Sequence, residues 1–147
     1  EMEGGLFYAS NFSIGVNIFF ALNRMLASLM AEQPQYRPAL EEIHHTQKLD
    51  APSGTAITLA EDILKHLERL HQWTNHTTDA PQTLPIISKR IADVPGTHEV
   101  VYNNPVDTIT IRHEAHSREG FVQGALAAAQ WMIGKKGYFE MKDLLGF

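Results

Sequence analysis

The 147-residue sequence has no cysteine, no basic run and no uninterrupted apolar stretch long enough to span a bilayer. Without cysteine the chain forms no disulfides and does no thiol chemistry, which fits a reducing compartment. The most apolar segment, residues 14–30, is interrupted by Asn17, Asn23 and Arg24, an argument against a membrane span or a secretory signal. The formal net charge of −5 argues against general nucleic-acid binding. We therefore expect a cytoplasmic protein with neither membrane nor nucleic-acid partners.

The sequence also lacks a P-loop and the glycine-rich fingerprint of a dinucleotide-binding Rossmann domain. Its adjacent glycines, Gly4 and Gly5, precede a strand-like segment instead of joining a strand to a helix. Residues 1–5 contain nothing typical of the start of a chain and lead directly into that apolar segment, as if the sequence began midway through a longer protein. We expect the Rossmann domain to be absent from this chain.

The residues that are present are typical of one globular domain, because 44% are apolar and 20% are charged. Periodicity and turn residues predict helices at about 14–33, 55–73 and 118–133, and strands at 6–9, 37–43, 84–91, 97–102 and 107–113. This pattern predicts an α+β fold with a mixed sheet of four or slightly more strands and helices on one face. Apolar residues on both strand faces, as in Ile86-Ile87 and Val100-Val101, indicate that the other face is buried in an oligomer.

The most informative segment runs from His44 to Thr55 and joins a predicted strand to a predicted helix. Ser53 is a favoured N-cap residue, so backbone N–H groups at the start of that helix should lack intrahelical partners and attract an anion. Gly54 has no side chain to block a ligand. His44, His45 and Lys48 add two imidazoles and an ammonium, which suit a proton transfer to a substrate that carries carboxylates.

Eight histidines raise the question of a metal site. His44 and His45 are neighbours in extended backbone, where side chains point to opposite sides. His113 and His116 have no cysteine or paired aspartate nearby. We therefore expect no metal site.

Other catalytic patterns are equally weak. Glu41 and Glu42 should diverge as adjacent strand residues, so they do not form a glycosidase pair. Ser53 lacks the nucleophile-elbow pattern and is better explained as a helix cap. A solvent-facing position would explain any one of the loop's titratable residues, but their concentration in one short loop favours a site.

The loop sequence His44-His45-x-x-Lys48-x-Asp50-Ala51-Pro52-Ser53-Gly54-Thr55-Ala56 resembles the signature of dihydrodipicolinate reductases, also called 4-hydroxy-tetrahydrodipicolinate reductases. The resemblance extends to Ser10-Asn11-Phe12-Ser13-x-Gly15-Val16-Asn17, Gly96-x-His98-x-Val100 and Ser117-Arg118-x-x-Phe121-x-x-Gly124-Ala125. It covers essentially the whole chain, but only as the C-terminal half of such an enzyme. Residues 1–147 would thus form one substrate-binding and tetramerisation domain, with 1–13 as the hinge segment from the missing nucleotide-binding domain.

The resemblance also implies roles for individual residues. His44 and Lys48 would be the catalytic proton-transfer pair, and His45, Gly54 and Thr55 would bind the cyclic dicarboxylate substrate. Ala9, Ser10, Asn11 and Phe12 would touch the nicotinamide end of NADH or NADPH, whose main binding domain lies outside this chain. The assembly implied is a homotetramer.

The implied chemistry belongs to diaminopimelate and lysine biosynthesis: hydride addition to a conjugated imine, followed by protonation of the resulting enamine. Two stretches depart from the family pattern. Ile91-Ala92 replaces the glycines that many relatives carry after the arginine matched by Arg90, and the Asn103-Asn104-Pro105 connection differs at a hairpin. The competing interpretation is a non-enzymatic α+β module that binds a ligand or supports assembly.

Overall fold

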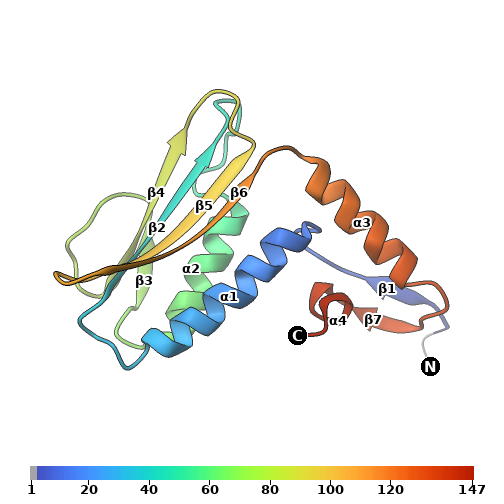
Figure 1. Ribbon diagram of the computed structural model, residues 1–147, viewed down its shortest axis with the longest axis horizontal. Helices are drawn as coiled ribbons and strands as arrows, with labels where there is room; N and C mark the ends of the chain where they lie inside the picture. Colours follow the sequence, from blue (N-terminus) through green and yellow to red (C-terminus); the bar gives the residue numbers. More distant parts are fainter. Residues whose placement is uncertain (1–2) are drawn as a thin grey trace. The chain divides into compact units, whose positions relative to one another are not determined.

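The computed structural model describes residues 3–147 as two compact units, here called the sheet unit, Leu22–His116, and the terminal unit, which combines residues 3–21 with Ser117–Phe147 (Figure 1). The elements in chain order are β1 Gly5–Phe7, α1 Ile14–Met30, β2 Arg37–His44, α2 Gly54–His66, β3 Gln72–Thr74, β4 Thr83–Arg90, β5 Gly96–Asn103, β6 Thr108–Ala115, α3 Glu119–Trp131, β7 Gly137–Phe139 and α4 Met141–Leu145. Helix α1 runs from the terminal unit into the sheet unit.

The sheet unit is built on a five-stranded mixed sheet with the order β3-β4-β2-β5-β6. The central strand β2 runs parallel to β4 and antiparallel to β5, and β5 pairs antiparallel with β6. The register places His44 opposite Arg90 on β4, and Glu42 opposite His98 on β5. Four side chains from three strands therefore meet at the end of β2.

One face of the sheet forms the core. Leu40, Ile86 and Val100 alternate with more exposed residues and are almost completely buried. Helix α2 and the second half of α1 cover this face (Figure 1), and the Asn23 side chain of α1 donates a 3.0 Å hydrogen bond to the Leu59 carbonyl of α2. The predicted α+β fold with a mixed sheet and helices on one face is confirmed, with five strands as its size.

Helix α2 is shorter than the sequence predicted. It ends at His66, and residues 72 and 73, expected at the end of the helix, belong to strand β3, which lies beside β4. Leu67 and Leu70 are buried as the helical spacing required, but they lie in the turn that follows the helix. Their i, i+3 spacing is the same in a helix and in this turn, so the pattern did not locate the helix end.

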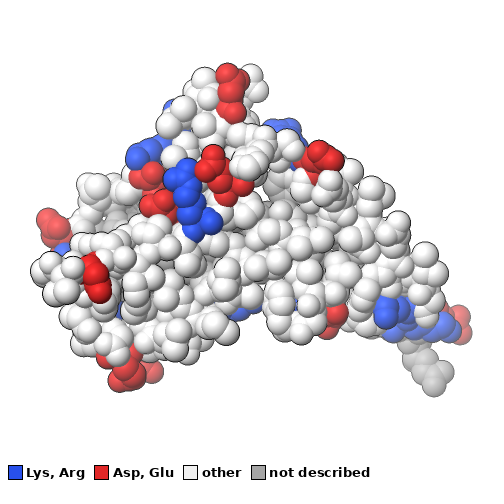
Figure 2. All heavy atoms as spheres, viewed as in Figure 1, with Lys and Arg blue, Asp and Glu red and all other residues white. Residues whose placement is uncertain are grey.

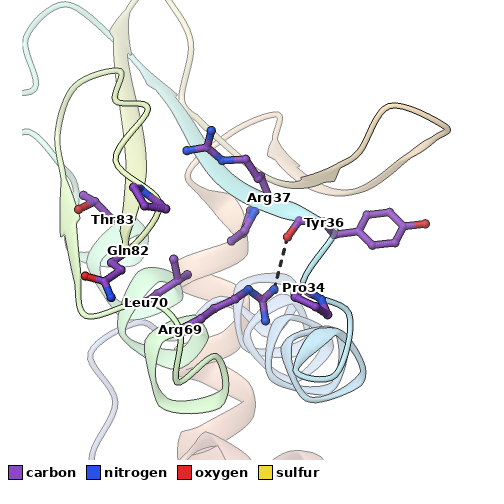
Figure 3. A pocket seen from close by; sticks show the side chains of 9 residues that line it. Pro34, Tyr36, Arg37, Arg69, Leu70, Gln82 and Thr83 are labelled. Atoms are coloured by element: carbon purple, nitrogen blue, oxygen red, sulfur yellow. Dashed lines mark hydrogen bonds between the residues drawn. The ribbon is translucent and has the colours of Figure 1, made fainter.

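A pocket of about 470 Å³ opens near Arg37, at the end of β2 away from His44 (Figure 3). Arg69 reaches across it and donates hydrogen bonds to the backbone carbonyls of Met30, Ala31 and Tyr36. The guanidinium is thus occupied by backbone groups at the end of α1, and its role here is structural.

The charged side chains on the face drawn in Figure 2 include both signs, often side by side over the sheet unit. Ion pairs of this unit include Lys89 with Glu41 at 2.6 Å and Arg112 with Glu114 at 2.8 Å. Within residues 3–147, no helix combines the length and apolar character needed to cross a bilayer.

The terminal unit brings the two ends of the chain together. Strand β1 pairs in parallel with β7, and Phe7 contacts the rings of Phe12 and Trp131 at centroid distances of 5.8 and 6.1 Å. Helix α3 packs closely on the chain before α1, because a Cβ at Gly124 would overlap the backbone carbonyl of Phe12. The absence of a side chain at Gly124 thus permits this close approach.

We predict that Gly124→Ala destabilises the protein, because the added methyl group displaces α3 from the backbone at Phe12. The loss should be about 1–3 kcal/mol of unfolding free energy, as for other overpacked sites. Gly120→Ala on the same helix is the matched control, because its Cβ would lie an ordinary 3.5 Å from Ser13 Oγ. That change should be neutral or stabilising by up to about 1 kcal/mol. Equal urea midpoints for the two variants would contradict this packing argument.

Candidate functional site

Strand β2 and helix α2 hold the two ends of the loop that the sequence singled out. Ser53 is the N-cap of α2 as predicted: its backbone is extended, with φ −66° and ψ 156°, and its Oγ accepts a 3.2 Å hydrogen bond from the Ala56 N–H. The Ala51–Pro52 peptide bond before it is cis. The helix start is therefore fixed by local capping.

The start of α2 remains open to a ligand. The Ala56 N–H donates to the Ser53 cap, but the N–H groups of Gly54 and Thr55 make no hydrogen bond within the described part of the chain. A Cβ built on Gly54 would meet nothing within 4 Å. Two N–H donors and the positive end of the helix dipole thus face accessible space, an arrangement that suits a carboxylate.

The titratable residues of the loop differ in their surroundings. His44 ends β2 and is 8% exposed, whereas His45 follows the strand and is half-buried. Lys48 is half-buried, and its Nζ lies 2.8 and 2.9 Å from the two carboxylate oxygens of Asp50. This contact lowers the pKa of the Asp50 carboxyl. Because Asp50 is exposed, the pair is weak and an incoming anion can compete for the ammonium.

A completely buried carboxylate lies behind the loop. Glu42 is 0% exposed and its Oε1 accepts a 3.1 Å hydrogen bond from Arg90. Its Oε2 lies 3.1 Å from His44 Nδ1 and 3.9 Å from His98 Nε2. Burial disfavours the charged carboxylate, but contacts with His44, Ser53 and Ser88 outweigh this effect and lower the pKa of Glu42. The cluster therefore contains a fixed negative charge beside His44.

His98 is the second ring of the cluster. It is 5% exposed, packs edge-on against His44 at a centroid distance of 5.0 Å, and has its Nε2 3.2 Å from the Ser53 Oγ. Burial, followed by the charge of His44, lowers the pKa of His98 to about 3. His98 is therefore neutral at physiological pH. It contacts both Ser53, the N-cap of α2, and His44.

Arg90 connects the loop to the buried carboxylate. Its NH2 group donates to the Asp50 carbonyl at 2.6 Å and its Nε donates to the Lys48 carbonyl at 3.3 Å, in addition to the bond to Glu42. One guanidinium thus holds both the backbone that carries Lys48 and the carboxylate beside His44.

Sequence reasoning gave Glu42, Arg90 and His98 no role in the site. Adjacent strand residues do diverge as expected, since Glu41 contacts Lys89 on one face and Glu42 turns into the core on the other. The available signal was the alternation along β2, which places Glu42 on the same face as buried Leu40. The partners on β4 and β5 depend on strand register, which the sequence alone does not specify.

Glu42, His44 and His98 also have ligand atoms within 4.8 Å of one another, a spacing that a metal ion can use. From the sequence we expected no metal, and this group was not identified there. The Arg90 guanidinium on the same carboxylate opposes a second cation, because like charges repel strongly at low dielectric. We assign no metal to the cluster.

The segment expected to touch a cofactor lies in the terminal unit. Asn11 fixes it, since its Oδ1 accepts from the Ser13 N–H at 2.9 Å and its carbonyl accepts from the Asn17 side chain at 2.8 Å. Ser10 is exposed, and Ala9 and Phe12 are half-buried. The segment therefore has a fixed backbone and one exposed hydroxyl.

Comparison with known proteins places the fold and the loop in one family. The family described as dihydrodipicolinate reductase, C-terminus, matches residues 15–145. The 4-hydroxy-tetrahydrodipicolinate reductases of Christiangramia forsetii and Laribacter hongkongensis are 50% and 36% identical to this chain, covering 97% and 98% of it. A solved structure, dipicolinate-bound dihydrodipicolinate reductase from Paenisporosarcina sp. TG-14, matches 93% of the chain with a TM-score of 0.67 and 26% identity.

These matches show that the chain corresponds to the C-terminal part of proteins that are named as reductases. The chain belongs to the dihydrodipicolinate reductase family. It spans 59% and 56% of the length of the two curated relatives and 53% of the solved structure.

We predict that acid destabilises the protein in two separable pH ranges. His98 has a lowered pKa in the fold, so its contribution is complete above about 6.5 and is lost as the pH falls toward about 3. Glu42 also has a lowered pKa, so its contribution is lost only below its ordinary value of 4.5. Each group contributes a slope of up to ~1.4 kcal/mol per pH unit.

Urea unfolding from pH 4 to 8 tests this assignment. His98→Gln should flatten the dependence mainly between pH 4.5 and 6.5, whereas Glu42→Gln should flatten it only below about 4.5, following the two ordinary pKa values. Wild-type slopes in both variants would show that neither group is linked to folding in this way.

Proposed function

We propose that this chain is the substrate-binding and assembly domain of a 4-hydroxy-tetrahydrodipicolinate reductase, with residues 1–13 as the hinge to a nucleotide-binding domain. The whole enzyme would reduce its cyclic dicarboxylate substrate with NADH or NADPH in the cytoplasm, on the route to diaminopimelate and lysine. The single observation that carries the proposal is the His44–Thr55 loop, which presents proton donors and an open helix start side by side.

Substrate binding rests on the helix start. The N–H groups of Gly54 and Thr55, together with the Thr55 hydroxyl, would hold one carboxylate, and His45 would supply a further polar contact. Helix N-termini favour such anions because unpaired N–H groups and the helix dipole act together. The dipicolinate bound to the Paenisporosarcina reductase is a ligand of the same chemical class.

The proton transfer rests on His44 and Lys48. Bound NADH or NADPH supplies the hydride for the conjugated imine, and the electron density that arrives there must then be balanced by a proton. Lys48 would leave Asp50 for a substrate carboxylate and stabilise the added negative charge, while His44 would protonate the enamine carbon. Without the domain that binds most of the cofactor, the chain should not turn over substrate.

The hinge segment would provide the chain's own contact with the cofactor. Asn11 is fixed by two hydrogen bonds, so Ala9, Ser10 and Phe12 have a defined backbone against which a nicotinamide ring can rest. We propose only this contact, since a Gly-rich fingerprint is missing from the sequence.

Assembly rests on the sheet face that the helices leave uncovered. Ala39, Ile43, Ile87 and Val101 belong to this face by alternation and are half-buried. An apolar strip in the middle of a sheet face is typical of an interface. We propose that four copies bury these faces against one another in a homotetramer.

The reductase assay on the full-length enzyme tests the proton-transfer roles. We expect His44→Asn, which keeps a donor near the Nδ1 position but has no Nε2, to lower kcat about 100- to 10,000-fold, the usual effect of losing a general acid. His71→Gln is the control, because His71 is an exposed histidine outside the loop. Full activity of His44→Asn would remove His44 from the mechanism.

Dipicolinate binding separates the enzyme from a module that only keeps the fold. Lys48→Ala should weaken dipicolinate at least about tenfold in calorimetry, since it removes a charge from the anion site. Thr77→Ala, in the exposed loop after β3, should bind as the wild type does. A wild-type protein without affinity for dipicolinate and without reductase activity would favour the assembly-module interpretation.

Sedimentation velocity tests the assembly proposal. Val101→Arg would place an unpaired charge in the middle of the proposed interface, so we expect a species smaller than the tetramer. Thr77→Arg adds the same charge at an exposed position of the loop after β3, outside the strands of the sheet, and should leave the mass unchanged. An unchanged mass for Val101→Arg would place the interface elsewhere.

A further inference from the structure

The proton chemistry described above uses His44 and Lys48 and leaves the buried carboxylate behind them without a role. Glu42 is 0% exposed, yet it is kept ionised by contacts from three strands or their flanks. A buried charge is costly unless it is paired and hydrogen-bonded, so its position beside a titratable ring is a specific feature of this site.

We propose that Glu42 is a positioning residue for His44: its carboxylate keeps the proton of the neutral ring on Nδ1, and so leaves Nε2 as the atom that exchanges a proton with the substrate. The inference rests on the proposed function and adds a residue to it. Its geometric basis is the 3.1 Å separation between Glu42 Oε2 and His44 Nδ1. These two atoms form no hydrogen bond of good geometry, so the carboxylate acts on the ring through its nearby charge, which favours hydrogen on the ring nitrogen that faces it.

The opposite side of the His44 ring agrees with this assignment. A Cβ at Gly96 would lie 3.1 Å from His44 Nε2 and 3.2 Å from Cδ2, closer than ordinary van der Waals contact. A side chain at this position would therefore crowd the nitrogen that we assign to proton exchange. Glycine leaves that nitrogen uncrowded on this side.

Two other charged or titratable groups near His44, His98 and Arg90, have different roles. His98, from β5, packs edge-on against the His44 ring and stays neutral, so it adds no charge beside that ring. Arg90, from β4, holds the far oxygen of Glu42 and, through two carbonyls, the backbone of the loop with Lys48. The Glu42 carboxylate thus orients the His44 ring. Arg90 in turn holds the loop that carries Lys48 in a fixed position relative to this carboxylate.

The test is the pH dependence of kcat/KM in the full-length enzyme with Glu42→Gln, which keeps the shape and removes the charge. Loss of an adjacent negative charge makes the imidazolium harder to form, so we expect the alkaline limb of the profile to move about 1 unit or more to lower pH. We also expect kcat at pH 7.5 to fall about 10- to 100-fold with KM changed less than about threefold.

Glu61→Gln is the matched control, because Glu61 is an exposed carboxylate of α2 that belongs neither to the loop nor to the sheet face proposed as the interface. It should leave the pH profile and kcat unchanged, and size-exclusion chromatography would check that its oligomeric state is also unchanged. Glu42→Asp, which retains a carboxylate, should return the alkaline limb toward the wild-type position. A merely structural role of Glu42 would not produce this return.

Glu42→Gln leaves the Arg90 charge without its partner and can fail to fold. The double variant Glu42→Gln/Arg90→Gln removes both charges of the pair and should show the same movement of the alkaline limb. Arg90→Gln alone leaves the carboxylate on His44, so its limb should stay in place or move to higher pH. If neither glutamine variant folds, Glu42→Asp is the test. Its shorter side chain holds the carboxylate farther from His44, so the alkaline limb of its kcat/KM profile should lie at a lower pH than that of the wild type.

The outcomes distinguish this inference from the proposed function. A wild-type enzyme without reductase activity, or a fully active His44→Asn, would refute the proposed function itself. An active wild type, an inactive His44→Asn and a wild-type alkaline limb in every folded variant of Glu42 would overturn the positioning role alone.

Discussion

The site depends on one electrostatic arrangement, the buried carboxylate of Glu42 between the Arg90 guanidinium and the His44 imidazole. Removing the negative charge would leave the half-buried Arg90 guanidinium without its carboxylate partner, and removing the cation would release the loop backbone that Arg90 holds at Lys48 and Asp50. The contacts of Glu42 with Arg90 and His44 therefore affect the proton chemistry, the loop conformation and the core packing together. The residues proposed to face the substrate, His44 and Lys48, are held in place by these contacts.

Strand register creates the arrangement. Glu42 faces His98 across the β2–β5 ladder, and His44 faces Arg90 across the β2–β4 ladder. A one-residue slip of β2 would turn both side chains to the open face of the sheet and bring Glu41 and Ile43 into the core. The apolar residues Leu40, Ile86 and Val100 pack only in the observed register, so core packing also fixes the site.

The sequence predicted what depends on short-range chemistry. The Ser53 cap, the strand-to-helix loop and the alternation of β2 all follow from residues within a few positions of one another, and the structure has them. The partnership of Glu42 with Arg90 depends on pairing across 48 positions, which no local pattern specifies. The end of α2 was misplaced for the converse reason, because Leu70 is buried by tertiary packing in a turn that imitates helical spacing.

Stability alone is a poor explanation for the Glu42 ion pair. Replacing a buried ion pair with apolar residues of similar volume is often neutral or stabilising, because desolvation of the two charges offsets most of their attraction. Leu40 and Val100 beside it show that this face of the sheet packs well with apolar side chains. The completely buried carboxylate of β2 lies against the one buried histidine of the loop. Its position is therefore better explained by the orientation of His44 than by the folding of the sheet.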